Sequence, residues 1–178
     1  MPEKPLEALR VVAGELSRVL SQGRADEMQA LQDAILGAQS VFVTGEGRSG
    51  LVARCFAMRL AHLGLKVQVV GETVTSAFRP GDLLIAVSGS GTTSATCLHA
   101  SSAADQGGRA VAVTANPGSP LARSADLALL VPSQGSVQFG GALFEQSALV
   151  LLDAIALALQ TRLGRTSEEM QARHATLE

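Results

Sequence analysis

The sequence predicts an α/β fold: a three-layer αβα sandwich around a five-stranded parallel sheet, doubly wound in flavodoxin-like order. Five short, continuously apolar runs alternate with segments of helical periodicity, as is typical of parallel strands covered on both faces. Right-handed crossovers then favour a doubly wound sheet. The length of 178 residues suits a single domain with a substantial core. With 47% hydrophobic residues but no Trp or Tyr, that core must be mainly aliphatic.

The single domain 1–178 divides into N-terminal helices (1–37), an αβα core (38–163) and a polar C-terminal tail (164–178). In the first part, apolar residues recur at helical spacing until Gly23 interrupts them, and a second helix follows the candidate N-cap Asp26. The tail is polar, and we expect it to be mobile.

The core elements follow from periodicity and glycine breaks. Strands are expected at 41–44, 66–70, 82–87, 109–114 and 126–131, and helices at 49–63, 92–106, 120–124 and 141–163. The last helix is apolar almost all round apart from one polar stripe. Such a helix is buried in a core or between subunits, and in a domain this small it favours an oligomer.

Charge and cysteine usage restrict the function. A formal net charge of −2 and the lack of a basic run give no electrostatic basis for nucleic-acid binding. Cys55 and Cys97 lie inside predicted helices without metal-ligand spacing, so we expect buried, reduced thiols and no metal site. No signal-peptide layout is present, and Glu145, Gln146 and Asp153 interrupt the most apolar helix. We therefore expect a cytoplasmic protein without a membrane span.

Two glycine- and hydroxyl-rich loops are the most informative motifs. GEGRSG at 45–50 follows the first predicted strand, and SGSGTT at 88–93 follows the third. Free backbone N–H groups and the helix dipole bind anions at such strand-to-helix turns. Because the first and third strands flank the switch point of a doubly wound sheet, both loops should border one site. The sequence therefore predicts a phosphorylated ligand.

A dinucleotide site is the alternative. Gly45, Gly47 and Gly50 match the G-x-G-x-x-G fingerprint, and Glu72 ends the next strand where a ribose-binding acid belongs. Arg48 in the turn, the second hydroxyl-rich loop and the lack of room for a substrate domain favour a compact phosphate instead. A P-loop is excluded because no Lys follows either glycine cluster.

The two loops resemble the sugar isomerase (SIS) domain, and longer strings resemble the 6-phospho-3-hexuloisomerase family. These strings are GRSG at 47–50, RCFAMRLAHLG at 54–64, VGET at 70–73, GALFEQ at 141–146, LLDA at 151–154 and RHATLE at 173–178. Gly140 departs from the Met expected there. The resemblance implies interconversion of 3-hexulose 6-phosphate and fructose 6-phosphate without metal or cofactor. It also implies a homotetramer with active sites at subunit interfaces and functional coupling to 3-hexulose-6-phosphate synthase.

Under this resemblance, the second loop and the start of the following helices bind the phosphate and sugar. The expected binding residues are Gly47, Arg48, Ser49, Ser88, Gly89, Ser90, Gly91, Thr92 and Thr93, with Glu72, Thr73 and Thr75 as sugar-hydroxyl contacts. The alternative for the hydroxyls is helix capping. For Arg48 the alternative is a surface ion pair.

Glu145 is the candidate base, since moving a carbonyl between C3 and C2 requires one carboxylate that takes a proton and returns it. It lies off the polar stripe of its helix, although a first-turn Glu is also favoured by the helix dipole alone. His62 is the candidate acid. It lies roughly 18 Å along its helix from the first loop, so it would serve a neighbouring subunit, unless it merely caps the helix. His99 is expected to be structural, and His174 in the tail could fold over a site.

Two competing functions remain open. One is another SIS isomerase, acting on arabinose 5-phosphate or a heptose phosphate through the same phosphate clamp. The other is a sugar-phosphate-sensing module without catalysis, although the first forty residues contain no basic recognition helix and a sensor has no use for Glu145.

Overall fold

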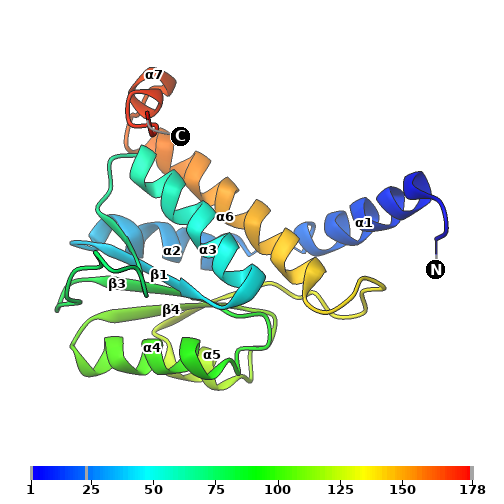
Figure 1. Cartoon of the computed structure of the whole chain (residues 1–178), viewed down its shortest axis with the longest axis horizontal. Helices are drawn as coiled ribbons and strands as arrows, with labels where there is room; N and C mark the ends of the chain where they lie inside the picture. The colour runs from blue at the N-terminus through cyan, green and yellow to red at the C-terminus, as the bar shows by residue number, and fades with distance from the viewer. Residues whose placement is uncertain (1, 23, 177–178) are drawn as a thin grey trace.

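A parallel five-stranded sheet lies at the centre of the computed structural model, which describes residues 2–22 and 24–176 (Figure 1). The strands are β1 (Val41–Gly45), β2 (Val67–Val69), β3 (Leu83–Val87), β4 (Arg109–Thr114) and β5 (Leu127–Leu130). Their order is β2-β1-β3-β4-β5, and every neighbouring pair is parallel. The predicted α/β class and flavodoxin-like order are confirmed.

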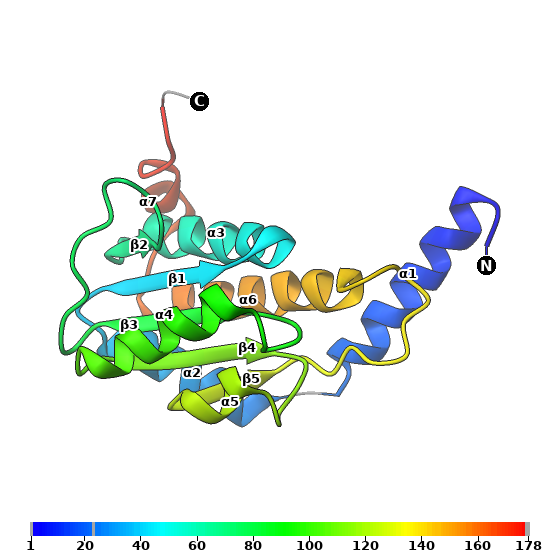
Figure 2. The same cartoon turned by 60° about the horizontal axis from the view of Figure 1, so that its bottom comes forward.

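Helices cover both faces of this sheet. They are α1 (Pro5–Leu20), α2 (Ala25–Gly37), α3 (Gly47–His62), α4 (Ser94–Asp105), α5 (Pro120–Ser124), α6 (Ala142–Arg162) and α7 (Ser167–Gln171). Figure 2 shows α4 and α5 on one side of the sheet, with α2, α3 and α6 on the other.

The strands divide their side chains between two apolar clusters because successive residues point to opposite faces. In β3, Ile85 and Val87 join the cluster of α2, α3 and α6, whereas Leu84 and Ala86 join the cluster of α4 and α5. All four are buried. Because both faces of the sheet are buried, the strands consist of continuous apolar residues.

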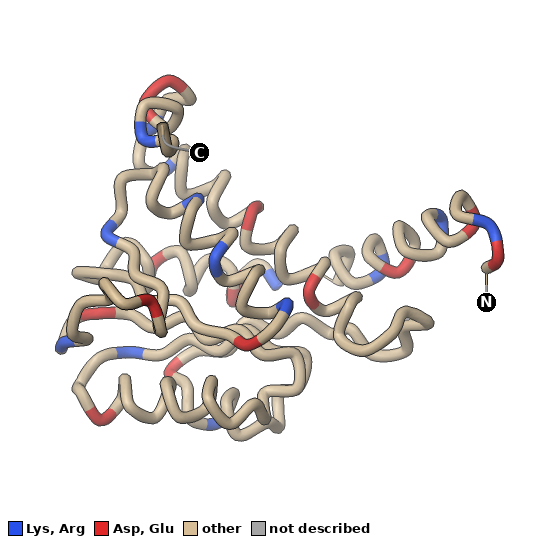
Figure 3. The backbone as a smooth tube through the Cα atoms, in the orientation of Figure 1, with Lys and Arg blue, Asp and Glu red and all other residues tan. Residues whose placement is uncertain are grey.

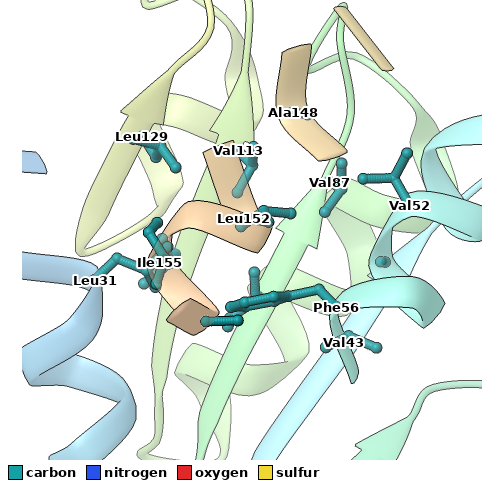
Figure 4. Packing of buried hydrophobic residues seen from close by; sticks show 14 of the residues in the cluster. Leu31, Val43, Val52, Phe56, Val87, Val113, Leu129, Ala148, Leu152 and Ile155 are labelled. Atoms are coloured by element: carbon teal, nitrogen blue, oxygen red, sulfur yellow. The ribbon is translucent and has the colours of Figure 1, made fainter. Parts of the chain in front are cut away.

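Helix α6 supplies much of the larger cluster. Figure 4 shows Leu152 and Ile155 of α6 beside Phe56 of α3 and Leu31 of α2, and all four side chains are buried. By length and composition α6 could cross a membrane. Half of its most apolar window is buried inside the fold. Packing against the sheet and α3 therefore accounts for the buried part of its apolar surface.

Helix α1 projects beyond the sandwich (Figures 1 and 2). It contacts α6, but Val19 is its one buried residue, and Leu6 and Leu9 near its start are exposed. Acidic and basic residues are interspersed along the described chain (Figure 3).

Several boundaries differ from those expected. Helix α2 is preceded by Arg24 as its N-cap, so the prediction of Asp26 was wrong, and Gly23 lies outside the described residues. Helix α3 begins two residues earlier than expected, and α4 begins two residues later. The tail is also more ordered than expected. It contains α7, whose N-terminus is capped by a capping box of Thr166 and Glu169.

Candidate active site

The two glycine-rich loops begin side by side at the carboxyl edge of the sheet. Gly45, the last residue of β1, pairs in register with Val87, the last residue of β3. A Cβ on Gly45 would lie 2.8 Å from the Val87 carbonyl oxygen, and one on Gly50 would lie 2.5 Å from the Gly45 carbonyl oxygen. These glycines are therefore required for α3 to start directly against the strand edge.

The second loop is held by its own hydroxyl groups. Ser88 Oγ lies 3.0 Å from Thr93 Oγ1 and accepts a hydrogen bond of 3.2 Å from the Gly91 amide. Ser90 Oγ accepts from both the amide and the hydroxyl of Thr92, at 3.2 and 3.0 Å. Ser88, Ser90, Thr92 and Thr93 thus form one compact, pre-ordered turn.

Glycine is needed within this turn as well. Gly91 has a φ of +64°, and a Cβ there would lie 2.1 Å from Ser119 Oγ. A Cβ on Gly89 would lie 2.9 Å from the ring of Phe144 at the start of α6. The turn is therefore packed between the region before α5 and the start of α6.

Capping does not account for the hydroxyl groups of these loops. The residues before α3 and α4 are Glu46 and Thr93, and within the described chain neither side chain makes a capping hydrogen bond. Thr93 bonds to Ser88 instead. Ser49 lies in the first turn of α3. The first amides of α3 and α4 consequently have no side-chain cap and retain their capacity to bind an anion.

Glu145 and Arg48 form an ion pair that joins the starts of α3 and α6, between Arg48 Nε and Glu145 Oε2. The Glu145 side chain is only 13% exposed, whereas that of Arg48 is 64% exposed. A Cβ on Gly141 would lie 3.3 Å from Glu145 Oε1, so the loop before α6 abuts the carboxylate. Of the two interpretations of Arg48, the structure contains the ion pair, and its partner is the candidate base.

Two hollows meet at this ion pair. One has a volume of about 220 Å³ and continues along α3 and α6 past Cys55 and Leu149. The other has a volume of about 430 Å³ and lies against residues 138–142. Since Phe144 contacts the second loop, the carboxylate and the predicted phosphate site occupy the same end of the sandwich.

Glu72 and Thr73 lie in the turn after β2, at the same edge of the sheet. Glu72 pairs with Arg54 of α3, both side chains being about half exposed, and Thr73 is exposed. Thr75 Oγ1 donates to the Val69 carbonyl oxygen at 2.6 Å. No described hydrogen bond or ion pair joins these residues to loop 88–93 or to Glu145, so the structure does not bring them into the same cluster.

His62 lies at the opposite end of α3, about 18 Å from the end of the first loop at 1.5 Å per residue. It is 6% exposed, and its ring stacks on that of His174, with centroids 5.1 Å apart and planes at 26°. Arg59, Gln160 and α7 complete a hollow of about 220 Å³ around the two rings. His62 and Glu145 are therefore not brought together within one chain.

The sequence analysis named His174 as a tail residue that could fold over a site, but it did not predict the contact with His62, and it missed Gln138. His174 contacts His62 across more than one hundred residues, and no local pattern indicates that contact. Gln138 pairs with Gln146, each amide donating to the other at 3.3 and 3.0 Å. The Gly-, Ser- and Gln-rich composition of loop 132–141, immediately before Glu145, was the signal available for Gln138.

His99 has a structural contact, as expected: its Nδ1 lies 2.8 Å from Thr44 Oγ1 and links α4 to β1. Among the described residues, no group of three or more His, Cys, Asp or Glu side chains could hold a metal ion. Cys55 is exposed and Cys97 is only partly buried, so the prediction of buried thiols was wrong.

Comparison with known proteins points to one family. The SIS domain matches residues 34–158. A 3-hexulose-6-phosphate isomerase from Mycobacterium gastri is 41% identical, covering 96% of this chain and 89% of the relative. One from Bacillus subtilis (strain 168) is 39% identical, covering 98% of this chain and all of the relative.

A solved structure extends the likeness to three dimensions. It is the crystal structure of a hypothetical protein from Methanococcus jannaschii, for which a molecular function of 3-hexulose-6-phosphate isomerase was inferred from that structure. The two structures superpose with a TM-score of 0.87 at 34% identity, covering 97% of this chain and 99% of the other.

Proposed function

This chain belongs to the SIS domain family, and from that premise we propose that it isomerises D-arabino-3-hexulose 6-phosphate to D-fructose 6-phosphate. The observation that carries the proposal is the ion-paired Glu145, placed beside a hydroxyl-rich anion loop in a chain with full-length relatives of that activity. We propose that the reaction serves ribulose monophosphate formaldehyde fixation in the cytoplasm and needs no cofactor.

The phosphate group binds at loop 88–93. The hydroxyls of Ser90 and Thr92 lie on the exposed side of the turn, and Ser88 and Thr93 stiffen it from within. The uncapped amides at the starts of α3 and α4 supply further donors, with Ser49 beside them. Such a site recognises the phosphate without determining which sugar is attached.

Glu145 transfers the proton. Its carboxylate takes the proton from C2 of the 3-ketose, leaving an enediolate across C2 and C3. It then returns the proton to C3 while the hydroxyl proton on O2 passes to O3, which leaves the carbonyl at C2. Arg48 orients this carboxylate through the ion pair. Its exposed guanidinium also places positive charge next to the oxygen that becomes negative in the enediolate.

We place His62 at the active site of a neighbouring subunit in a tetramer, as the acid for ring opening. The distance along α3 prevents it from serving the site of its own chain. Leu51 on α3 and Leu157 on α6 are exposed apolar side chains that association would cover. Because His174 stacks on His62, the tail would border the same site.

The first test is isotope exchange. The purified protein is incubated with fructose 6-phosphate in deuterated water, and the carbon-bound protons are followed by NMR. Loss of the C3 proton together with a new 3-hexulose signal is expected. Exchange at C1 would indicate an aldose–ketose isomerase, and saturable binding without exchange would indicate the sensing module.

The metabolic role has a separate test. A 3-hexulose-6-phosphate synthase, supplied with formaldehyde and ribulose 5-phosphate, should yield fructose 6-phosphate only when this protein is added. Fructose 6-phosphate in its absence would remove the proposed coupling.

A further inference from the structure

Loop 132–141 borders the Glu145 carboxylate yet contains no helix or strand. Gly135 and Gly140 have φ values of +74° and +61° and nothing within 4 Å of an added Cβ, so packing does not restrain the backbone there. Phe139 between them is 98% exposed. The position of this loop must therefore be set by hydrogen bonds to other parts of the chain.

Three of those bonds go to one carboxylate. Glu15 of α1 accepts from the Ser136 hydroxyl at 2.8 Å, from the Val137 amide at 2.8 Å and from Gln138 Nε2 at 2.9 Å. Arg18, one turn further along α1, donates to the Gln134 carbonyl oxygen at 3.1 Å. Helix α1 thus holds the loop at Gln134 and at residues 136–138.

The same contacts continue to the candidate base. Gln138, bonded to Glu15, also pairs with Gln146 of α6, the residue after Glu145. At the end of the loop, Gly141 abuts Glu145 Oε1. Gln138 thus links Glu15 to the start of α6, and the backbone from Gln138 to Gly141 leads to the Glu145 carboxylate.

We propose that Glu15 is a positioning residue for the isomerase site: it fixes loop 132–141 and so sets the orientation of Glu145. This inference rests on the proposed function. The three hydrogen bonds also keep the pKa of Glu15 below its ordinary value, the Gln138 bond being the largest cause. Glu15 is therefore an ionised acceptor for the loop at neutral pH.

The test compares Glu15→Gln with a matched control, Glu7→Gln, which removes the same charge from an exposed position about 12 Å away on the same helix. For Glu15→Gln we expect kcat to fall at least tenfold, while the Kd for fructose 6-phosphate and the Tm stay unchanged. An error in the orientation of a base affects the transition state and not the bound substrate. Glu7→Gln should keep the wild-type kcat.

Loop mobility is measured separately by chymotrypsin, which can cut after the exposed Phe139. Mass spectrometry should find this cut at least tenfold faster in Glu15→Gln than in Glu7→Gln. The double variant Glu15→Gln with Gln138→Glu reverses the polarity of the side-chain hydrogen bond, because Gln at 15 can donate to Glu at 138. It should restore part of both kcat and the resistance to cleavage, because one amide oxygen at position 15 replaces the two carboxylate oxygens that accept from Ser136 and Val137.

A wild-type kcat and an unchanged cleavage rate in Glu15→Gln would overturn the inference, as would a lowered Tm without a lowered kcat. If the wild-type protein shows no isomerase activity at all, the proposed function fails. The cleavage rates of the single and double variants would still decide whether Glu15 holds the loop.

Discussion

At the scale of single residues, Glu145 and Arg48 carry the proposed chemistry. They are 97 positions apart in the chain, and they meet because α3 and α6 pack side by side and both begin at the same end of the sandwich. The pair leaves the carboxylate mostly buried and the guanidinium mostly exposed. The base is thereby shielded while its partner can reach a ligand.

Glu145→Gln should retain fructose 6-phosphate binding and lose about a hundred- to ten-thousandfold in turnover, because the amide cannot accept the carbon-bound proton. Exchange at C3 in deuterated water and the Kd for fructose 6-phosphate are the two measurements. Asp105→Asn, an exposed carboxylate at the end of α4 on the other face of the sheet, is the control and should keep wild-type turnover. Normal exchange in Glu145→Gln would exclude this residue as the base.

Ser88→Ala should weaken the binding of every phosphorylated ligand. The hydroxyl accepts from the Gly91 amide and contacts Thr93, so its removal loosens the turn that faces the phosphate. A lost hydrogen bond between neutral groups costs about 0.5–1.5 kcal/mol, or roughly two- to tenfold in Kd. Calorimetry with fructose 6-phosphate measures this, with the exposed Ser101→Ala as control. Equal affinities in the two variants would exclude loop 88–93 as the phosphate site.

The sequence located the two loops, but it could not locate the contacts between the residues around them. Glycine spacing located both loops because the close approaches at Gly45, Gly50 and Gly91 admit no side chain. Arg48 stayed open between two interpretations, because a local pattern cannot identify a partner on another helix.

At the scale of elements, strands were predictable and the segments between them were not. A strand buried on both faces is apolar without interruption, and this pattern is local. Loop 132–141 instead depends on a carboxylate more than 120 positions away. Helix α7 could have been predicted, since Thr166 and Glu169 have the spacing of a capping box.

The contact between α1 and this loop should weaken in acid. The pKa of the Glu15 carboxylate is lower in the folded chain than in the unfolded chain. Its ionised form therefore stabilises the fold at any pH above the unfolded-state pKa, and this stabilisation is lost as the pH falls through the folded-state pKa. The Val137 amide resonance should therefore shift on acidification, with a midpoint below the ordinary glutamate value of about 4.3. In Glu15→Gln that transition should disappear. A midpoint above the ordinary value would contradict the hydrogen bonds that Glu15 accepts.

At the scale of the whole molecule, the two proposed catalytic residues lie too far apart to act within one chain. Glu145 is at the start of α6 and His62 is at the end of α3, and the apolar Leu51 and Leu157 on these helices are exposed. The sequence indicated this separation through helix length alone. It could not indicate how the surfaces of two chains meet.

Subunit mixing tests the shared site. His62→Ala and Glu145→Gln should each be inactive alone, because every site then lacks one of the two residues. Mixed oligomers, formed by unfolding and refolding the two variants together, should recover a fraction of wild-type activity at sites that combine an intact His62 with an intact Glu145. No recovery, despite mixed oligomers detected by native mass spectrometry, would place both residues in the site of one chain or remove His62 from catalysis.

Helix α3 has a further consequence in the proposed assembly. It carries Arg48 at one end and His62 at the other, so one rigid rod of about 24 Å belongs to two catalytic centres at once. Its length becomes the spacing between neighbouring centres. A tilt of the rod caused by substrate at one centre would move the imidazole at the next, giving the oligomer a mechanical route to cooperative turnover.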